Sequence, residues 1–275
     1  MFECPGVLIS KGSQRFFTQT IRGMRSKPHR KSTFINLDRT RCAIQEISGY
    51  TPTDATIWRS VRSNNLQRLT REFLWKCIHN TFRVGNFWSH IDHLEIIGRC
   101  HGCQVPESLE HIALECDVHG QSTVWQLTRH LWNMKFAVWP TMKWGLILGC
   151  NLVKFKSTKG LLVREQGRLF AILVSIAWRL IWNLRVARVI RNPDMPLNED
   201  AIHNQWLKMV NAALQRDRIL TNKARFGTLA LNKQTVLNTW SGLLMDEDSL
   251  PDDWIFTKGV LVGIRPKAAT ANGIG

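Results

Sequence analysis

The amino-acid sequence predicts a mainly helical protein. Several segments repeat apolar residues at the three- and four-residue spacing of an amphipathic helix, and no series of segments shows the alternation of β-strands. The 275 residues, 44% of them hydrophobic, are enough to bury a core. Residues 100–116 add three cysteines and one histidine in a pattern typical of a metal site. We therefore expect a mainly α fold with a small metal-binding turn, a disordered basic N-terminus and a flexible C-terminal tail.

Composition divides the chain into four parts. Residues 1–35 are basic and interrupted by Gly, Pro and Ser, so we expect them to form a tail or linker. Residues 36–120 should hold helices and the metal-binding turn, and residues 121–222 should form a helical bundle. From 223 to 275 the apolar stretches become short, which predicts a weakly structured tail.

Three helices are expected before the cysteine cluster. The first covers 38–49, with Asp38 as its N-cap and Gly49 as its stop, and a second short helix begins near Pro52 or Thr53. The third has the clearest pattern, because its apolar residues form a continuous stripe. The residues of this stripe are Leu66, Leu69, Phe73, Leu74, Cys77, Ile78 and Phe82.

Further helices are expected after the cluster. Ser122 is a natural N-cap for the first of them, and Pro140 and Gly145 then indicate an irregular link. The segment 167–192 is apolar on nearly all sides in its first half, which predicts the central buried helix. The last helix is capped by Asn198. It should bury Ile202, Trp206, Met209, Val210, Ala213 and Leu214.

Twelve Trp residues against a single Tyr are unusual. Exposed aromatic rings can stack single-stranded bases, but most of these Trp residues fall on helix faces, where core packing is the commoner role. We therefore expect core packing for most of them. Cys77 lies on the apolar stripe of its helix and should be chemically inert for the same reason.

The formal net charge of +16 favours polyanionic partners. Nine Lys or Arg residues and one acid lie between Lys11 and Arg41, so this segment alone contributes +8. RNA or DNA is therefore an expected partner, bound through phosphates with weak sequence preference. A solvated linker, a localisation signal or a water-facing helix surface is the alternative. The candidate phosphate-contacting residues are Arg22, Arg25, Lys27, Arg30, Lys31, Arg39, Arg41, Arg68, Arg71, Lys76 and Arg83.

The segment CHGCQVPESLEHIALEC carries the one clear chemical motif. Two residues separate Cys100 from Cys103, a spacing that lets two thiolates converge from one tight turn. The PESLEH stretch predicts a helix start that is capped by Ser108 and presents His111, with Cys116 just past the helix end. Three thiolates and one imidazole form a closed tetrahedral set, which predicts a structural zinc ion and leaves no position for a catalytic water.

Several alternatives lie close to this motif. His93, His101 and His119 are near, so a neighbouring histidine could replace His111, although His101 lies between the two cysteines and should point away from the metal. A Cys-x-x-Cys redox pair is another possibility, but it leaves the histidine and the last cysteine without a role. The simplest alternative is a set of scattered buried cysteines that share no metal ion. Gly102 should supply the left-handed geometry of the turn.

No signal peptide is apparent near the start of the chain, and the longest apolar run, from Leu169 to Trp178, has ten residues. A bilayer span needs about 20 residues, so we expect a buried helix and no membrane partner. The expected location is intracellular, nuclear or cytoplasmic. Thiols stay reduced there, and metal binding explains the cysteine cluster better than disulfides do.

The motif and its surroundings resemble a known family region. The zinc-binding region at the C-terminal end of non-LTR (LINE-type) retrotransposon polyproteins has a Cys-x-x-Cys, a Glu-Ser/Thr-x-x-His and a final Cys, which match Cys100, Cys103, Glu107, Ser108, His111 and Cys116. The stretches FLWKCIHNTFRVGNFW, ILGC and IHNQWL are similar to the versions in fungal elements, and the resemblance covers roughly residues 33 to 220. It implies a zinc-binding region that helps the element's polymerase to hold its RNA template or target DNA. Upstream reverse transcriptase and ribonuclease H portions would then be partners.

The catalytic residues of those upstream domains are not recognisable. The pair Asp252 and Asp253 lies in a Pro-flanked acidic turn, unlike the metal-binding aspartates of a reverse transcriptase. Seven scattered acids precede Cys100, whereas a ribonuclease H needs several converging carboxylates. The segment before residue 35 would be the end of a ribonuclease H domain whose catalytic part is absent. We therefore expect a detached, non-catalytic fragment and not an enzyme.

Two classes of function follow from these expectations. The first is a zinc-stapled helical module that binds nucleic acid. The second is a helical protein-interaction domain that docks on a polymerase. A contiguous basic surface favours the first, and an exposed apolar patch favours the second. A degenerate element remnant without a cellular role is the third possibility.

Overall fold

The structure is a computed structural model that describes residues 12–24, 30–116, 118, 120–191 and 198–268. Its α-helices are α1 (Gln14–Met24), α2 (Lys31–Ser48), α3 (Asp54–Val61), α4 (Arg68–Ile78), α5 (Gln121–Asn133), α6 (Trp144–Leu148), α7 (Arg164–Val186), α8 (Glu199–Leu220), α9 (Lys223–Phe226) and α10 (Lys233–Trp240). Shorter helical turns are η2 (Gly85–His90), η3 (Glu95–Gly98), η4 (His111–Glu115), η6 (Cys150–Leu152), η7 (Ala187–Arg191), η8 (Gly227–Leu229), η9 (Glu247–Ser249) and η10 (Trp254–Phe256). Strands β1 (Phe155–Lys156) and β2 (Leu162–Val163) form one antiparallel hairpin. The mainly α fold class is confirmed.

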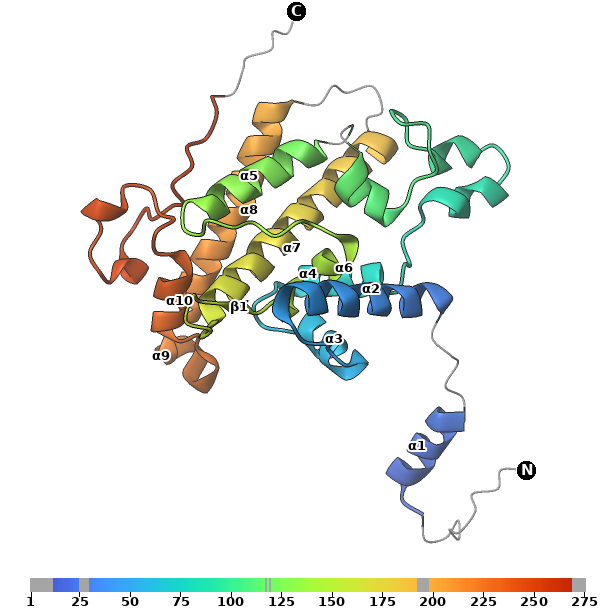
Figure 1. Cartoon of the computed structure of the whole chain (residues 1–275), viewed down its shortest axis with the longest axis horizontal. Helices are drawn as coiled ribbons and strands as arrows, with labels where there is room; N and C mark the ends of the chain where they lie inside the picture. The colour runs from blue at the N-terminus through green and yellow to red at the C-terminus, as the bar shows by residue number, and fades with distance from the viewer. Residues whose placement is uncertain (1–11, 25–29, 117, 119, 192–197, 269–275) are drawn as a thin grey trace, which may run out of the picture.

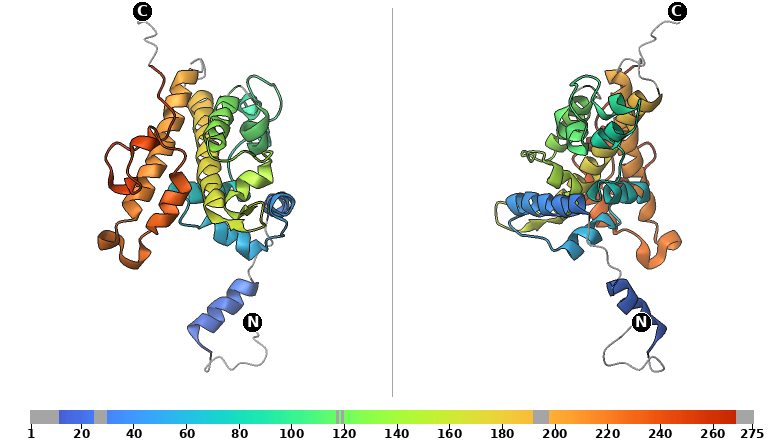
Figure 2. Two further views of the ribbon diagram at one scale, coloured as in Figure 1. Left: turned by 60° about the vertical axis from the view of Figure 1, so that its left-hand side comes forward. Right: turned by 90° about the vertical axis from the view of Figure 1, so that its right-hand side faces the viewer.

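Helix α7 runs through the middle of the molecule, with α4, α5, α8 and α10 packed around it (Figures 1 and 2). Every side chain from Arg168 to Trp178 is buried, as expected for the central helix. The stretch Arg164–Val189 is long and apolar enough to cross a membrane by length and composition. Inside this structure, 72% of its most apolar window is buried.

Most Trp residues pack in the core, as predicted. Trp132, Trp178, Trp206 and Trp240 are among the largest fully buried side chains. Their indole N–H groups find partners: Trp206 Nε1 donates to Thr128 Oγ1 over 3.0 Å, and Trp178 Nε1 lies 3.3 Å from Cys77 Sγ. Cys77 is fully buried in the core, as predicted, and burial raises the pKa of its thiol to about 12, which disfavours the reactive thiolate.

Helix α2 begins at Lys31 and not at Asp38, so the expected boundary of the N-terminal tail at residue 35 is wrong. Asp38 lies inside the helix, where it pairs with Arg41. The extra turns are held by tertiary contacts of the buried Asn36, whose side-chain amide donates to the last carbonyls of α4 and accepts from the Trp144 indole. Helix α1 also lies in the segment that was expected to be disordered.

Three of the predicted helix ends are marked by local capping groups, and one is not. Gly49 ends α2 with φ 69°, Thr53 Oγ1 caps α3, and Asn198 Oδ1 accepts from the Ala201 N–H at the start of α8, all as predicted. Ser122 does not cap α5, because this helix already begins at Gln121.

Two details of the predicted pattern are wrong for packing reasons. Leu69 is 63% exposed, because α4 buries the side that carries Thr70, Phe73 and Leu74. Gly145 lies in helix α6 and not in an irregular link. A Cβ at this position would lie 2.1 Å from the Arg39 carbonyl oxygen, so the glycine allows α6 to pack directly against the backbone of α2.

The C-terminal segment, residues 223–264, is packed from α10 onward and is not weakly structured there, whereas α9 and η8 bury no residue. An ion pair between Arg168 and Asp217, 2.6 Å long and 7% and 0% exposed, lies beneath it. Asp217 Oδ2 also accepts from Trp240 Nε1, and Arg168 donates to Thr239 Oγ1. The buried side chains of the segment include Val236, Trp240, Leu243, Leu244, Trp254, Ile255, Val260, Val262 and Ile264.

Candidate metal centre

The first two cysteines of the motif lie on a turn closed by backbone hydrogen bonds. The Cys100 N–H donates to Val105 O and the Gln104 N–H donates to Cys100 O, over 2.9 and 2.8 Å. Gln104, with φ 57°, takes the left-handed conformation that we expected of Gly102. The glycine is required for space instead, because a Cβ there would lie 2.0 Å from Val118 Cγ2.

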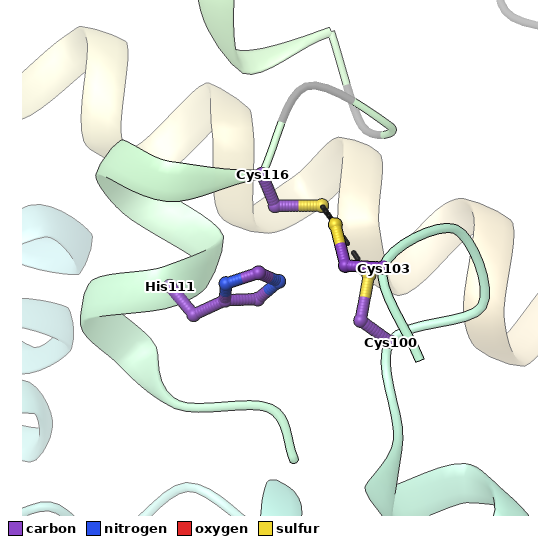
Figure 3. A group of neighbouring side chains, drawn as sticks. All are labelled: Cys100, Cys103, His111 and Cys116. Atoms are coloured by element: carbon purple, nitrogen blue, oxygen red, sulfur yellow. Dashed lines mark hydrogen bonds between the residues drawn. The ribbon is translucent and has the colours of Figure 1, made fainter. Parts of the chain in front are cut away.

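The histidine and the last cysteine lie on one short helix. Ser108 Oγ accepts from the His111 N–H over 2.9 Å, which confirms the predicted cap. The helix then widens into the π-type turn η4, in which the Cys116 N–H donates to His111 O, five residues earlier, over 3.0 Å. This wider turn lets both side chains reach the same point beside the cysteine turn (Figure 3).

The four predicted ligands converge. Their ligand atoms all lie within 4.8 Å of one another. Cys116 Sγ lies 3.3 Å from Cys100 Sγ and 3.7 Å from Cys103 Sγ, and none of these cysteines forms a disulfide. Sulfurs bound to one tetrahedral ion at about 2.3 Å would be about 3.8 Å apart. The group could therefore hold a metal ion with little movement of its side chains.

The imidazole of His111 is oriented for metal binding. Its Nδ1 lies 3.3 Å from Glu115 Oε2, one helical turn away, and its Nε2 is buried without a hydrogen-bond partner. A carboxylate at Nδ1 favours the tautomer that carries its proton there, which leaves the Nε2 lone pair for a metal. An uncompensated buried nitrogen is costly, and a metal at this point would satisfy it.

The three thiols do not hold their protons equally. Burial raises the pKa of Cys100, but the backbone N–H of Cys103 and the neighbouring His111 and Cys116 side chains favour the thiolate, outweigh burial and lower this pKa to about 6. Burial and the neighbouring Cys100 thiolate raise the pKa of Cys116 well above its usual range. One thiolate therefore forms readily, and a doubly charged ion would replace the protons of the others.

Buried and half-buried contacts attach this segment to the helical body. The carboxylate of Glu107 and the guanidinium of Arg185 in α7 form an ion pair in which both side chains are nearly fully buried. Glu110 pairs with Arg39 of α2 over 2.7 Å, and the Trp125 indole donates to Ala113 O over 2.7 Å. The metal-binding helix is thus fixed to α2, α5 and α7.

Among the rival ligands, His93 and His101 are exposed and do not belong to the converging group. His119 lies outside the described residues. The histidine of the group is therefore His111, as predicted.

The candidate phosphate-contacting residues have different surroundings. Arg25 and Lys27 lie outside the described residues. Arg39 and Lys76 already pair with Glu110 and Glu72, each over 2.7 Å, and Arg41 pairs with Asp38 and Asp54. Arg71 donates to Leu66 O and to Asn64 Oδ1. The exposed members of the set are Arg22, Arg30, Lys31, Arg39, Arg68 and Arg83, and of these Arg39 is already paired with Glu110.

A further group of arginines lies around the connection from α3 to α4. Residues 55–71 contain no acid. Arg216 of α8 donates to the Asn65 carbonyl in this connection, and Arg179 of α7 donates to the Leu69 carbonyl in the first turn of α4. We call the group Arg59, Arg62, Arg68 and Arg71 the arginine corner. The sequence-based set contained only the last two of these residues, although the acid-free stretch was a visible sign of the others.

Neither a protein-family model, nor a curated protein, nor a solved structure matches the chain. The geometry of the site therefore carries the functional argument.

Proposed function

We propose that this chain is a non-catalytic, zinc-stapled helical module that binds RNA or DNA with little sequence preference. The observation that carries the proposal is the arginine corner, a surface segment of four arginines without an acid from 55 to 71, on a chain with a net charge of +16. Both Arg59 and Arg68 are exposed, and neither belongs to an ion pair with an acid within 4.0 Å among the described residues, so both can neutralise phosphates.

The metal part of the proposal assigns zinc to Cys100, Cys103, His111 and Cys116. Three sulfurs and one imidazole nitrogen are the donor set that zinc prefers in structural sites, and four protein ligands leave no position for a reactive water. The ion would supply local folding free energy. The helix that carries His111 contacts α2, α5 and α7 through Glu110, Ala113 and Glu107, so the ion would also support these helices.

We also propose that the chain derives from a non-LTR retrotransposon polyprotein. The resemblance to the zinc-binding region of a non-LTR retrotransposon polyprotein agrees with a basic helical module that carries one metal site. In that setting the module would hold nucleic acid for the polymerase portion of the same element.

The test is a salt titration of binding. Fluorescein-labelled single-stranded RNA and duplex DNA are titrated with the zinc-loaded protein at low and moderate salt, and micromolar binding that weakens steeply with salt is expected. Arg59→Gln with Arg68→Gln should weaken binding to both and reduce the salt slope. Lys159→Gln with Lys258→Gln, which removes the same charge from other exposed positions, is the matched control. Binding to neither nucleic acid at low salt refutes the proposal.

The second candidate function is protein docking, and one surface favours it. Phe34 and Ile35 of α2 are 54% and 45% exposed. Ile35 borders a cavity of about 530 Å3 whose lining also includes Leu114 and Met142. If the titration is negative, Ile35→Asp should abolish capture of the polymerase portion supplied as a separate protein.

A further inference from the structure

One Trp residue departs from the core-packing pattern. The structure describes all twelve Trp residues, and Trp75 is the single one among the exposed large hydrophobic side chains, at 47%. It lies on α4, one turn after Arg71 and two turns after Arg68, so the three side chains follow one another along the same side of the helix. An exposed indole in a line of arginines is not explained by core packing.

The Trp75 ring is held in place by other rings. The His79 ring lies against its edge, with centroids 4.4 Å apart at 63°, and stacks on Trp58 of α3, with centroids 4.9 Å apart at 20°. His79 Nδ1 is hydrogen-bonded to Thr33 Oγ1 of α2 over 3.0 Å. Three helices therefore fix this aromatic cluster, while nearly half of the Trp75 surface stays open to solvent.

Basic side chains lie along the helix side that carries the exposed ring and beside the aromatic cluster. Arg62 donates from Nε to the Trp58 carbonyl, which places it beside the cluster at the end of α3. The nearest acid on α4, Glu72, is paired with Lys76 over 2.7 Å. The hydrogen bond and charge of Lys76 lower the pKa of Glu72, with smaller contributions from Arg68 and Arg179. One acid among these bases leaves the surface with a net positive charge. We call Trp58, Arg62, Arg68, Arg71 and Trp75 the aromatic-arginine surface.

We propose that the aromatic-arginine surface binds single-stranded nucleic acid, with a base stacked on Trp75 and the flanking phosphates at Arg62, Arg68 and Arg71. The proposal rests on the proposed nucleic-acid function and specifies the form of the ligand. An unpaired strand can turn a base face toward an indole, whereas a duplex keeps its bases stacked on one another. A purely apolar partner would leave three arginines facing a surface without charge, so the charge favours a polyanion.

The test compares two probes and three variants. The zinc-loaded protein is titrated into a fluorescein-labelled dT strand of about 20 nucleotides and into the same strand paired with dA, with anisotropy as the readout. Trp75→Ala should weaken single-strand binding about fivefold or more and change duplex binding by less than about twofold. Trp75→Phe keeps an aromatic ring and should restore most of the affinity. Phe256→Ala, which removes a 67% exposed ring from the C-terminal segment, should change neither.

Each outcome decides between the two proposals. If the wild-type protein binds and Trp75→Ala binds the single strand equally well, the stacking proposal is wrong and the broader function stands. Equal losses for strand and duplex also overturn it, since stacking would affect only the strand. If the wild-type protein binds neither probe, the broader function itself fails. If Trp75→Ala abolishes self-association in sedimentation velocity without changing strand binding, the surface is a contact between copies. Thermal unfolding followed by circular dichroism verifies that each variant is folded.

Discussion

The metal-binding segment (residues 95–116) and the C-terminal segment (residues 223–264) are both built from short helical turns, but different forces hold them. The metal-binding segment buries a few apolar side chains, such as Leu109 and Ile112, and leaves Ile96 78% exposed. Its four ligand side chains converge on one point. The C-terminal segment places Trp240 and Trp254 in the core.

This difference shows that a segment of short helical turns can be ordered either by apolar packing or by a metal site. The C-terminal segment shares the apolar core of α7 and α8, so its order depends on the stability of the whole molecule. The metal-binding segment is attached by a few polar contacts and by a small number of apolar side chains, such as Leu109 and Ile112. We therefore expect its order to depend on the occupancy of one metal site. A substitution that disrupts the C-terminal segment should therefore destabilise the whole molecule, and one that disrupts the metal-binding segment should have a local effect.

Zinc removal should have the largest local effect. Structural zinc contributes of order 10 kcal/mol to the folding of small domains. Cys116→Ser, or treatment with a strong chelator, should therefore abolish hydrogen-exchange protection in residues 95–116 while α7 and α8 keep theirs. Cys42→Ser, at an exposed cysteine outside the cluster, is the control. Protection that is equal in Cys116→Ser and the wild type would contradict the metal assignment.

Breaking the buried ion pair beneath the C-terminal segment should lower the stability of the whole molecule. Asp217→Ala leaves Arg168 buried without its partner and removes the acceptor of the Trp240 indole, so a loss of about 3–5 kcal/mol in the free energy of unfolding is expected. Urea unfolding measures it. Glu46→Ala removes an exposed pair with Lys143 and should cost less than about 1 kcal/mol. A similar small cost for both variants would show that the pair does not support the core.

Zinc affinity should rise with pH. The raised pKa of Cys116 means that this thiol is protonated at neutral pH in the absence of metal, so binding must release its proton. Each unit of acidification below neutral pH should then weaken binding about tenfold or more, because protons compete with the ion for the ligands. Competition with a chromophoric chelator at several pH values, corrected for the chelator's own protonation, measures this slope. A flat profile would exclude thiolate coordination.

The smallest effect should come from one helix cap. Ser108→Ala removes the acceptor of the His111 N–H and should destabilise the metal-binding helix by about 1 kcal/mol, which weakens zinc binding about fivefold. Ser122→Ala is the matched control, because this serine lies inside α5 and caps nothing there. The same loss in both variants would mean that the cap is not coupled to the metal site.

The sequence predicted those parts of the fold that depend on near neighbours in the chain. The ends marked by Gly49, Thr53 and Asn198 follow from backbone groups within four residues. The early start of α2 could not be predicted in this way, because Asn36 bonds to α4 and to Trp144, 108 residues later. The order of the C-terminal segment likewise depends on Asp217 and on other partners that are distant in sequence.

In the candidate site, too, the features set by near neighbours in the sequence could be predicted and those set by distant residues could not. All four ligands lie within seventeen residues, so their spacing carries the information, and the spacing of Glu115 from His111 would have identified the residue that orients the imidazole. The buried pair of Glu107 and Arg185 joins residues 78 apart and has no local pattern. The role of Gly102 was misassigned, because the side chain that approaches it, Val118, follows the motif.

The uneven exposure of the four ligands also bears on how the ion would leave. Cys103 is the solvent-exposed ligand, while the other three lie in the interior. An incoming small chelator or a zinc-accepting protein would therefore attack from this one side and displace one sulfur before the others. Exchange should then be second order, with a rate that increases with the concentration of the acceptor, and it would not require the helical body to unfold.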